Sequence, residues 1–151
     1  MNEFNPNRKE YDPRMHSAEH ILNQTMIRMF DCGRTINAHI EPKKSRIDFR
    51  MEQCPSPVKI AEIENRVNTV IQADLPIKEQ FLSREEAAKN YSLVRLPEDA
   101  GETIRIITVG DYDACPCSGP HVVSSKEIGV FKIASTDFQD GVLRIRYKLI
   151  V

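Results

Sequence analysis

Two short pairs of metal-binding side chains, far apart in the sequence, constrain how this chain can fold. His16 and His20 form an HxxxH pair, and Cys117 and His121 form a CxxxH pair. Side chains four residues apart on a helix point to the same face, one turn apart. Imidazole and thiolate are preferred ligands of zinc. If the fold joins the two pairs, the chain has a mononuclear metal site.

The same residues have a plainer interpretation, in which a histidine pair packs in the core and an unrelated turn carries the cysteine. Each pair alone is a weak signal, but their joint presence is stronger because only His39 lies outside the pattern. The metal interpretation assigns four ligands: His16, His20, Cys117 and His121. Four protein ligands make a structural zinc site, whereas three ligands and a water make a catalytic one. The sequence leaves that choice open.

Three residues near the pairs are candidates for supporting roles. Cys115 is interpreted as a buried thiol rather than a further ligand, because Pro116 stiffens the backbone between it and the ligand cysteine. Asp113 either orients a ligand histidine or caps a turn. Glu19 lies about 100° around the helix from His20, so we expect it on the surface and not as a general base.

Length and composition favour one domain with its own core. The chain has 151 residues and a net charge of -1, which is ordinary for a globular protein. No segment is long and apolar enough to span a bilayer, and the N-terminus lacks the apolar region of a signal peptide. We therefore expect a cytoplasmic protein with reduced thiols.

The near-neutral charge argues against strong nonspecific binding to nucleic acid, but it allows local basic patches. Two groups of cations are candidates either for such patches or for solvated strand faces. They are Lys43, Lys44, Arg46 and Arg50 in the first group, and Arg144, Arg146 and Lys148 in the second.

Helical and strand patterns are mixed without a regular βαβ repeat. Asp12 and Pro13 predict the start of a helix that runs to about Phe30, and Ser56 opens another that runs to about Ala73. A capping box predicts a short helix after Ser83. Strands are expected at residues 36–40, 46–51, 75–82, 103–109, 128–135 and 142–151. The predicted class is α+β, with helices packed on a mostly antiparallel sheet, residues 1–12 as a flexible arm and residues 13–151 as one domain.

Several blocks of the sequence resemble a known family. The HxxxH pair resembles that of the editing domains of alanyl- and threonyl-tRNA synthetases, and Cys117-Ser-Gly-Pro-His121 resembles their CxxxH segment. The similarity continues through four further blocks, which are residues 45–49, 64–71, 128–133 and 141–145. The resemblance covers residues 13–151 and implies the fold of that editing domain.

The resemblance implies an enzyme that removes a wrong amino acid from tRNA. The chain carries no synthetase catalytic, anticodon-binding or oligomerisation domain, so it looks like a freestanding AlaX editing protein of the short type, acting in trans without ATP. The implied substrate is seryl-tRNA(Ala), or glycyl-tRNA(Ala) in some members. The implied catalytic residues and Zn²⁺ ligands are the same four, His16, His20, Cys117 and His121. The expected partner is the acceptor end of mischarged tRNA, not DNA or a membrane.

Substrate contacts are expected on the segment that follows the first helix. Thr35 and Asn37 fall near the family's polar specificity segment, and His39 and Arg46 come shortly after them. A site that hydrogen-bonds the serine hydroxyl rejects alanine, because alanine leaves its buried polar groups unpaired. An ordinary polar edge strand is the alternative interpretation of Thr35, Asn37 and His39.

Other functions remain open at this point. The Ser-Gly-Pro sequence inside the CxxxH segment is closer to the threonyl branch, which implies editing of seryl-tRNA(Thr), and some domains of that branch hold no metal. A noncatalytic module that binds aminoacyl-tRNA around a structural zinc is a second alternative, and a metal-dependent hydrolase of another small ester is a third. Lys43, Lys44 and Arg46 favour tRNA over a small ester.

Overall fold

The computed structural model describes residues 12–91, 93 and 101–150. The helices in this part of the chain are α1 (Pro13–Phe30), α2 (Pro57–Gln72), α3 (Arg84–Asn90) and the short η2 (Ser125–Ile128). The strands are β1 (Asn37–His39), β2 (Ser45–Arg50), β3 (Ile77–Ser83), β4 (Thr103–Val109), β5 (Asp113–Pro116), β6 (Val130–Gln139) and β7 (Val142–Ile150). The arm expected at residues 1–12 lies outside the described residues except for Asp12, so it stays a prediction, as does the single domain over residues 13–151.

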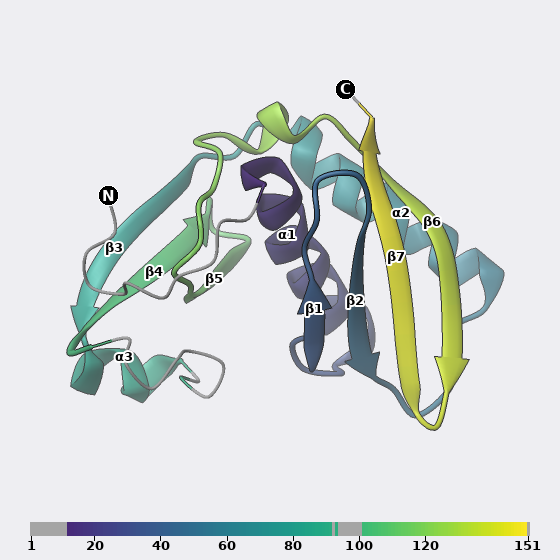
Figure 1. The fold of residues 1–151 in the computed structure, drawn as a ribbon, viewed down its shortest axis with the longest axis horizontal. Coiled ribbons are helices and arrows are strands. Elements are labelled where there is room, and N and C mark those ends of the chain that lie inside the picture. Colours follow the sequence, from purple (N-terminus) through teal and green to yellow (C-terminus); the bar gives the residue numbers. More distant parts are fainter. Residues whose placement is uncertain (1–11, 92, 94–100, 151) are drawn as a thin grey trace.

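The strands form two antiparallel sheets with helix α1 between them. The larger sheet has the order β1-β2-β7-β6 and the smaller has the order β3-β4-β5. Figure 1 shows α1 in the centre, the smaller sheet on the left, and α2 behind the larger sheet on the right. The predicted α+β class is confirmed, but the strands form two sheets where one was expected. Among the described helices, none is long and apolar enough to cross a membrane.

Helix α1 begins and ends as its sequence predicts. The Asp12 carboxylate accepts hydrogen bonds from the backbone N–H groups of Arg14 and Met15, both at 3.0 Å, which satisfies donors that a helix start otherwise leaves unpaired. The helix ends at Phe30, where Asp31 adopts a left-handed conformation with φ 51. Every residue from Met15 to Asn23 is buried. Polar side chains in that stretch therefore need partners inside the protein.

The main core fills the space between α1, α2 and the inner face of the larger sheet. Alternate residues of β2 and β7 point into it, as strand geometry requires; they are Ile47, Phe49, Leu143, Ile145 and Tyr147. Each such side chain contributes about 1.5–3 kcal/mol through burial. The Tyr147 hydroxyl donates to the carbonyl oxygen of Met15 at 3.0 Å, so the sheet also fixes the first turn of α1.

Two strand predictions differ from the structure. The sequence did not predict β5, which has only four residues and is held by pairing with β4. Strand β6 runs to Gln139 instead of ending near Ser135, because its pairing with β7 shifts register between Ile133 and Ser135 and then continues. Such an irregularity breaks the hydrophobic alternation by which a strand is recognised.

Candidate metal centre

The HxxxH pair and the CxxxH pair meet on one side of α1. The potential ligand atoms of His16, His20, Cys117 and His121 all lie within 4.8 Å of one another. Cys117 Sγ lies 3.3 Å from His16 Nε2 and 3.4 Å from His121 Nε2. The His16 and His121 rings stack with their centroids 4.1 Å apart. The structure thus brings together the four side chains that the sequence selected, in a cluster that we call the His–Cys cluster.

Strand pairing and one arginine position the CxxxH loop against α1. Strand β5 pairs with β4 and ends at Pro116, so Cys117 begins the loop directly after the strand. The Cys117 N–H donates to the Arg105 carbonyl oxygen at 3.1 Å. The Arg105 guanidinium donates in return to the carbonyl oxygens of Gly119 at 2.6 Å and Cys117 at 3.3 Å. Arg105 therefore holds the loop at both of these points.

Two histidine rings are oriented by their outer nitrogens. His16 Nδ1 lies 3.1 Å from the Pro120 carbonyl oxygen, an acceptor, so this nitrogen carries the hydrogen. His121 Nδ1 lies 2.9 Å from Ser17 Oγ, and Ser17 Oγ also accepts from the Val122 N–H at 3.2 Å. Both rings consequently turn Nε2 towards Cys117. Partners of this kind on the outer nitrogen fix the ring orientation that metal binding needs.

His20 contacts a second group of potential ligands behind the cluster. His20 Nδ1 lies 3.3 Å from Cys115 Sγ and 3.7 Å from Asp113 Oδ2. Asp113 is buried and pairs with both ends of the Arg34 guanidinium, at 2.8 Å and 3.2 Å. Gln24 also donates to Asp113 at 2.9 Å. Asp113 thus lies where it can orient His20, one of the two interpretations that the sequence left open.

The electrostatics of the cluster favour a thiolate at Cys117. Burial opposes its ionisation, but the charges of His16 and His20 and hydrogen bonds from His121 and His16 outweigh burial and hold the pKa of Cys117 well below its usual value. Burial, together with the charge on His20, lowers the pKa of His121 to about 3, so that imidazole is neutral. Burial raises the pKa of Cys115. A thiolate beside a neutral imidazole is the donor chemistry that zinc binds, and Cys115 stays a neutral thiol.

The expectation for Glu19 was wrong. It was expected on the surface, but it is only 9% exposed, and Oε1 lies 3.8 Å from His16 Nε2 and 3.9 Å from His20 Nε2. The Asn23 amide donates to the other carboxylate oxygen, and Asn23 Oδ1 accepts from the Thr35 N–H at 2.7 Å. The prediction failed because sheets flank α1 on both sides, so Glu19 is buried although it lies about 100° around the helix from His20.

The residues predicted to contact substrate lie along β1 and β2, outside the His–Cys cluster. The Thr35 hydroxyl is buried and donates to the carbonyl oxygens of Asp48, at 2.6 Å, and Asn37, at 2.8 Å. Asn37 and His39 are exposed on β1, the edge strand of the larger sheet. Arg46 on β2 lines a surface hollow that His39 also lines. Their roles in substrate binding stay predictions.

Sequence reasoning missed three residues that support the cluster. Ser17 hydrogen-bonds His121, Arg34 neutralises Asp113, and Arg105 holds the CxxxH loop. Only Ser17 carried a local signal, because it lies inside the HxxxH pair. The two arginines act on residues far away in the sequence, so no spacing pattern marks them.

The fold and the buried cluster define a protein that can hold a metal ion. Comparisons with known proteins show what the chain is similar to. Residues 104–146 match the family described as "Threonyl and Alanyl tRNA synthetase second additional domain". The chain is 34% identical over 134 residues to the alanine–tRNA ligase of Fervidobacterium nodosum. It is 32% identical over 139 residues to that of Halorhodospira halophila and 30% identical over 145 residues to that of Idiomarina loihiensis. The relationship predicted from the sequence is confirmed: most of the chain is similar to a segment of alanine–tRNA ligases, and part of it matches the second additional domain of threonyl and alanyl tRNA synthetases.

The similarity concerns one segment of these ligases. The three alignments cover 87%, 91% and 95% of this chain, but only 16%, 16% and 17% of the ligases. The chain therefore spans about a sixth of the length of the curated relatives it matches, and the relationship is with that segment.

Removal of the Arg34 guanidinium is expected to destabilise the protein. Burial opposes ionisation of Asp113, but hydrogen bonds with His20 and Arg34 outweigh it and hold the pKa of its carboxyl well below the usual value. Arg34→Ala leaves that buried charge without its main partner, so we expect the free energy of unfolding, measured in urea, to fall by about 2–3 kcal/mol. Arg66→Ala, which breaks an exposed pair with Glu62, is the control and should cost less than about 0.5 kcal/mol. If Arg34→Ala lowers the free energy of unfolding by no more than Arg66→Ala does, the result contradicts this role of Arg34.

Proposed function

We propose that this chain hydrolyses the ester bond between a wrongly attached amino acid and the acceptor end of tRNA. The observation that carries the proposal is the convergence of His16, His20, Cys117 and His121 within 4.8 Å, in a chain related to the editing domains of alanyl-tRNA synthetases. The substrate that this relationship favours is seryl-tRNA(Ala), with glycyl-tRNA(Ala) second. Action in trans, as a separate cytoplasmic protein, stays a prediction.

The donor set fits Zn²⁺ as the cofactor. Zinc binds imidazole nitrogen at about 2.1 Å and thiolate sulfur at about 2.3 Å in tetrahedral sites, which places the donors roughly 3.3–3.6 Å from one another. Cys117 Sγ lies 3.3 Å from His16 Nε2 and 3.4 Å from His121 Nε2. These two pairs of donors therefore already have nearly the spacing of a zinc site. When bound, zinc polarises a carbonyl oxygen or lowers the pKa of a water to about 7.

Glu19 completes the proposed mechanism from a position beside the His–Cys cluster. Asn23 fixes its carboxylate, and Oε1 lies within 3.9 Å of both His16 Nε2 and His20 Nε2. From there it can accept a hydrogen bond from an attacking water or from the ammonium group of the bound amino acid. Either contact positions a reacting group against an ester that is already activated.

Glu19→Gln keeps the shape of the side chain but removes its charge, so it isolates this role. We expect kcat for mischarged tRNA to fall at least about 50-fold, in the range that positioned acid–base groups supply. Zinc content should be retained. Initial rates across substrate concentrations, with metal analysis of the same sample, give both values. Glu52→Gln, at an exposed glutamate, is the matched control, and a Glu19→Gln enzyme as fast as this control excludes the role.

A noncatalytic module is the second candidate, and one observation favours it. Three imidazoles and one thiolate fill all four positions of a tetrahedral zinc, which is the arrangement of a closed, structural site. The two candidates are separated by incubating the protein with mischarged tRNAs and measuring free amino acid. The enzyme releases it, whereas the module binds charged tRNA without turnover. Seryl-tRNA(Thr) in the same panel tests the threonyl-type specificity.

A further inference from the structure

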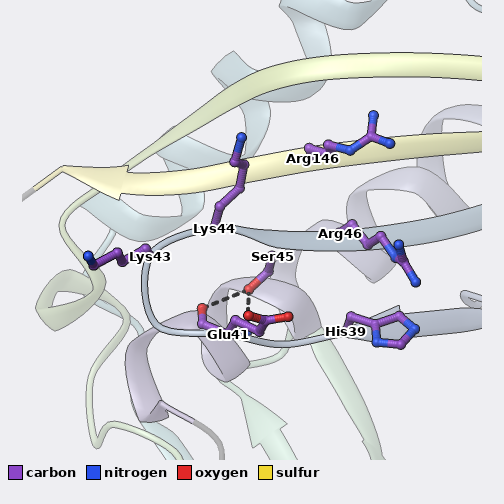
Figure 2. A pocket seen from close by; sticks show the side chains of 7 residues that line it. All are labelled: His39, Glu41, Lys43, Lys44, Ser45, Arg46 and Arg146. Carbon is purple, nitrogen blue, oxygen red and sulfur yellow. Dashed lines mark hydrogen bonds between the residues drawn. The ribbon is translucent and has the colours of Figure 1, made fainter.

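The outer face of the larger sheet carries a hollow that is distinct from the His–Cys cluster. It is formed where the turn between β1 and β2 meets β7. Figure 2 shows the seven residues that line it: His39, Glu41, Lys43, Lys44, Ser45, Arg46 and Arg146. Four of the seven are lysine or arginine, so we call it the basic hollow.

Most of the positive charge in the basic hollow is not neutralised. Within the described part of the chain, no ion pair involves Lys43, Lys44 or Arg46. Arg146 pairs with Asp137, and Glu41 is the one acidic side chain among the described residues that line the hollow. The Nε atom of Arg46 is buried and finds no hydrogen-bond partner among the described residues. A buried donor without a partner is costly, and an anionic ligand that draws the guanidinium towards it relieves that cost.

The register of the strands extends this charge across the sheet. His39 on β1 pairs with Arg46 on β2, and Arg46 pairs in turn with Arg146 on β7. On β7, Arg144, Arg146 and Lys148 share the outer face, because Leu143, Ile145 and Tyr147 point into the core. Arg144 is neutralised by Asp48. The remaining cations form a row along and across the strands, which suits an extended polyanion better than one small anion.

The basic hollow adjoins the helix that carries the proposed catalytic residues. Ser45 in its lining contacts Met15 through an Oγ–Sδ distance of 3.4 Å, and Met15 directly precedes His16. Strand β1 makes a second connection: His39 near its end lines the hollow, and Thr35, just before its start, donates to Asn23 on α1. The basic hollow is therefore linked through short contacts to the helix that carries the cluster, and a ligand much longer than the hollow is needed to reach both.

We propose that the basic hollow binds the phosphate backbone of the tRNA whose acceptor end enters the His–Cys cluster. The identity of the ligand as tRNA rests on the proposed function. Lysine and arginine contacts to phosphate position a nucleic acid without reading its sequence, and a guanidinium binds phosphate oxygens in pairs. Lys43, Lys44 and Arg46 supply these contacts, so each adds to the affinity for tRNA and to its dependence on salt.

The test is the binding of uncharged tRNA, which does not depend on hydrolysis. The triple variant Lys43→Ala, Lys44→Ala, Arg46→Ala is compared with the wild type by fluorescence anisotropy from low to high salt. We expect affinity to fall at least about tenfold at 0.1 M salt, and the log–log salt slope to become shallower by about 2–3, as the loss of three phosphate contacts requires. A second variant, Lys43→Arg, Lys44→Arg, Arg46→Lys, keeps the charge and should keep the affinity to within about threefold.

The matched control removes three lysines that are exposed elsewhere, in the variant Lys78→Ala, Lys89→Ala, Lys126→Ala. It changes the net charge equally and should retain most of the affinity. Equal weakening in both alanine triples overturns the proposal, because net charge then explains the loss. The proposal is also overturned if the triple alanine variant of the basic hollow binds tRNA as tightly as the wild type, or if the wild type does not bind tRNA. In a third outcome, the wild type shows salt-dependent tRNA binding that only the basic-hollow triple loses, but the wild type releases no amino acid from any tRNA. That outcome refutes the proposed hydrolysis and leaves the proposed binding surface intact.

Discussion

Replacement of His16 or Cys117 by alanine is expected to abolish the hydrolysis of mischarged tRNA. Each variant removes a donor from the cluster, and Cys117 is the donor that contacts both His16 Nε2 and His121 Nε2. Loss of a partner that only orients a metal ligand costs about 10–100-fold in affinity or activity, so loss of a ligand should cost more than about 100-fold. Amino-acid release under single-turnover conditions measures this loss directly.

Cys54→Ala is the control for these variants. Cys54 is an exposed free thiol outside the cluster, so its loss should leave the rate unchanged. Normal rates in both His16→Ala and Cys117→Ala contradict the assignment of the cluster as the active site. A loss of rate in all three variants points to a general effect of substitution on the protein instead.

Removal of zinc is expected to have the second large effect. We expect about one zinc per chain, and a fall of about 10 °C in the unfolding temperature after chelation. A ligand at a thousand times its Kd adds about 4 kcal/mol to the stability of the folded state, and 1 kcal/mol corresponds to about 2–4 °C in a chain of this size. The cluster joins α1 to the loop after β5, so its stability is coupled to the packing of α1 against the smaller sheet.

Chelation of the Cys117→Ala variant serves as the control for the zinc experiment. This variant lacks the thiolate, so a chelator should change its unfolding temperature far less than that of the wild type. A wild-type protein with no zinc and full hydrolytic activity excludes zinc as the cofactor. In that case His16, His20, Cys117 and His121 would hold the substrate themselves, as the resemblance to the threonyl branch implied.

The elements that the sequence predicted well are those whose signals are local. Asp12 and Pro13 predicted the start of α1, and Ser56 predicted the start of α2, because a helix cap acts on the next few residues. The structure bears out both starts, with the Ser56 hydroxyl accepting from the Lys59 N–H. The ligand pairs were recognisable for the same reason, since each lies within one turn of chain.

What the sequence could not show depends on contacts between distant segments. Strand β5 exists through its pairing with β4, and Glu19 is buried because two sheets enclose α1. The two cationic groups looked alike in the sequence. In the structure Arg144 and Arg146 are neutralised by Asp48 and Asp137. Lys43, Lys44 and Arg46 of the first group instead line the basic hollow, with no such partners among the described residues. Pairing in three dimensions, not composition, separates these two groups.

The most direct test of the proposed function is the release of amino acid from a panel of mischarged tRNAs by the purified, zinc-loaded protein. The panel contains seryl-tRNA(Ala), glycyl-tRNA(Ala), seryl-tRNA(Thr) and correctly charged alanyl-tRNA(Ala). We expect rapid release of serine from seryl-tRNA(Ala), no release of alanine above the uncatalysed rate, and loss of the serine release in Cys117→Ala. No release from any member of the panel by folded, zinc-loaded protein contradicts the proposed function.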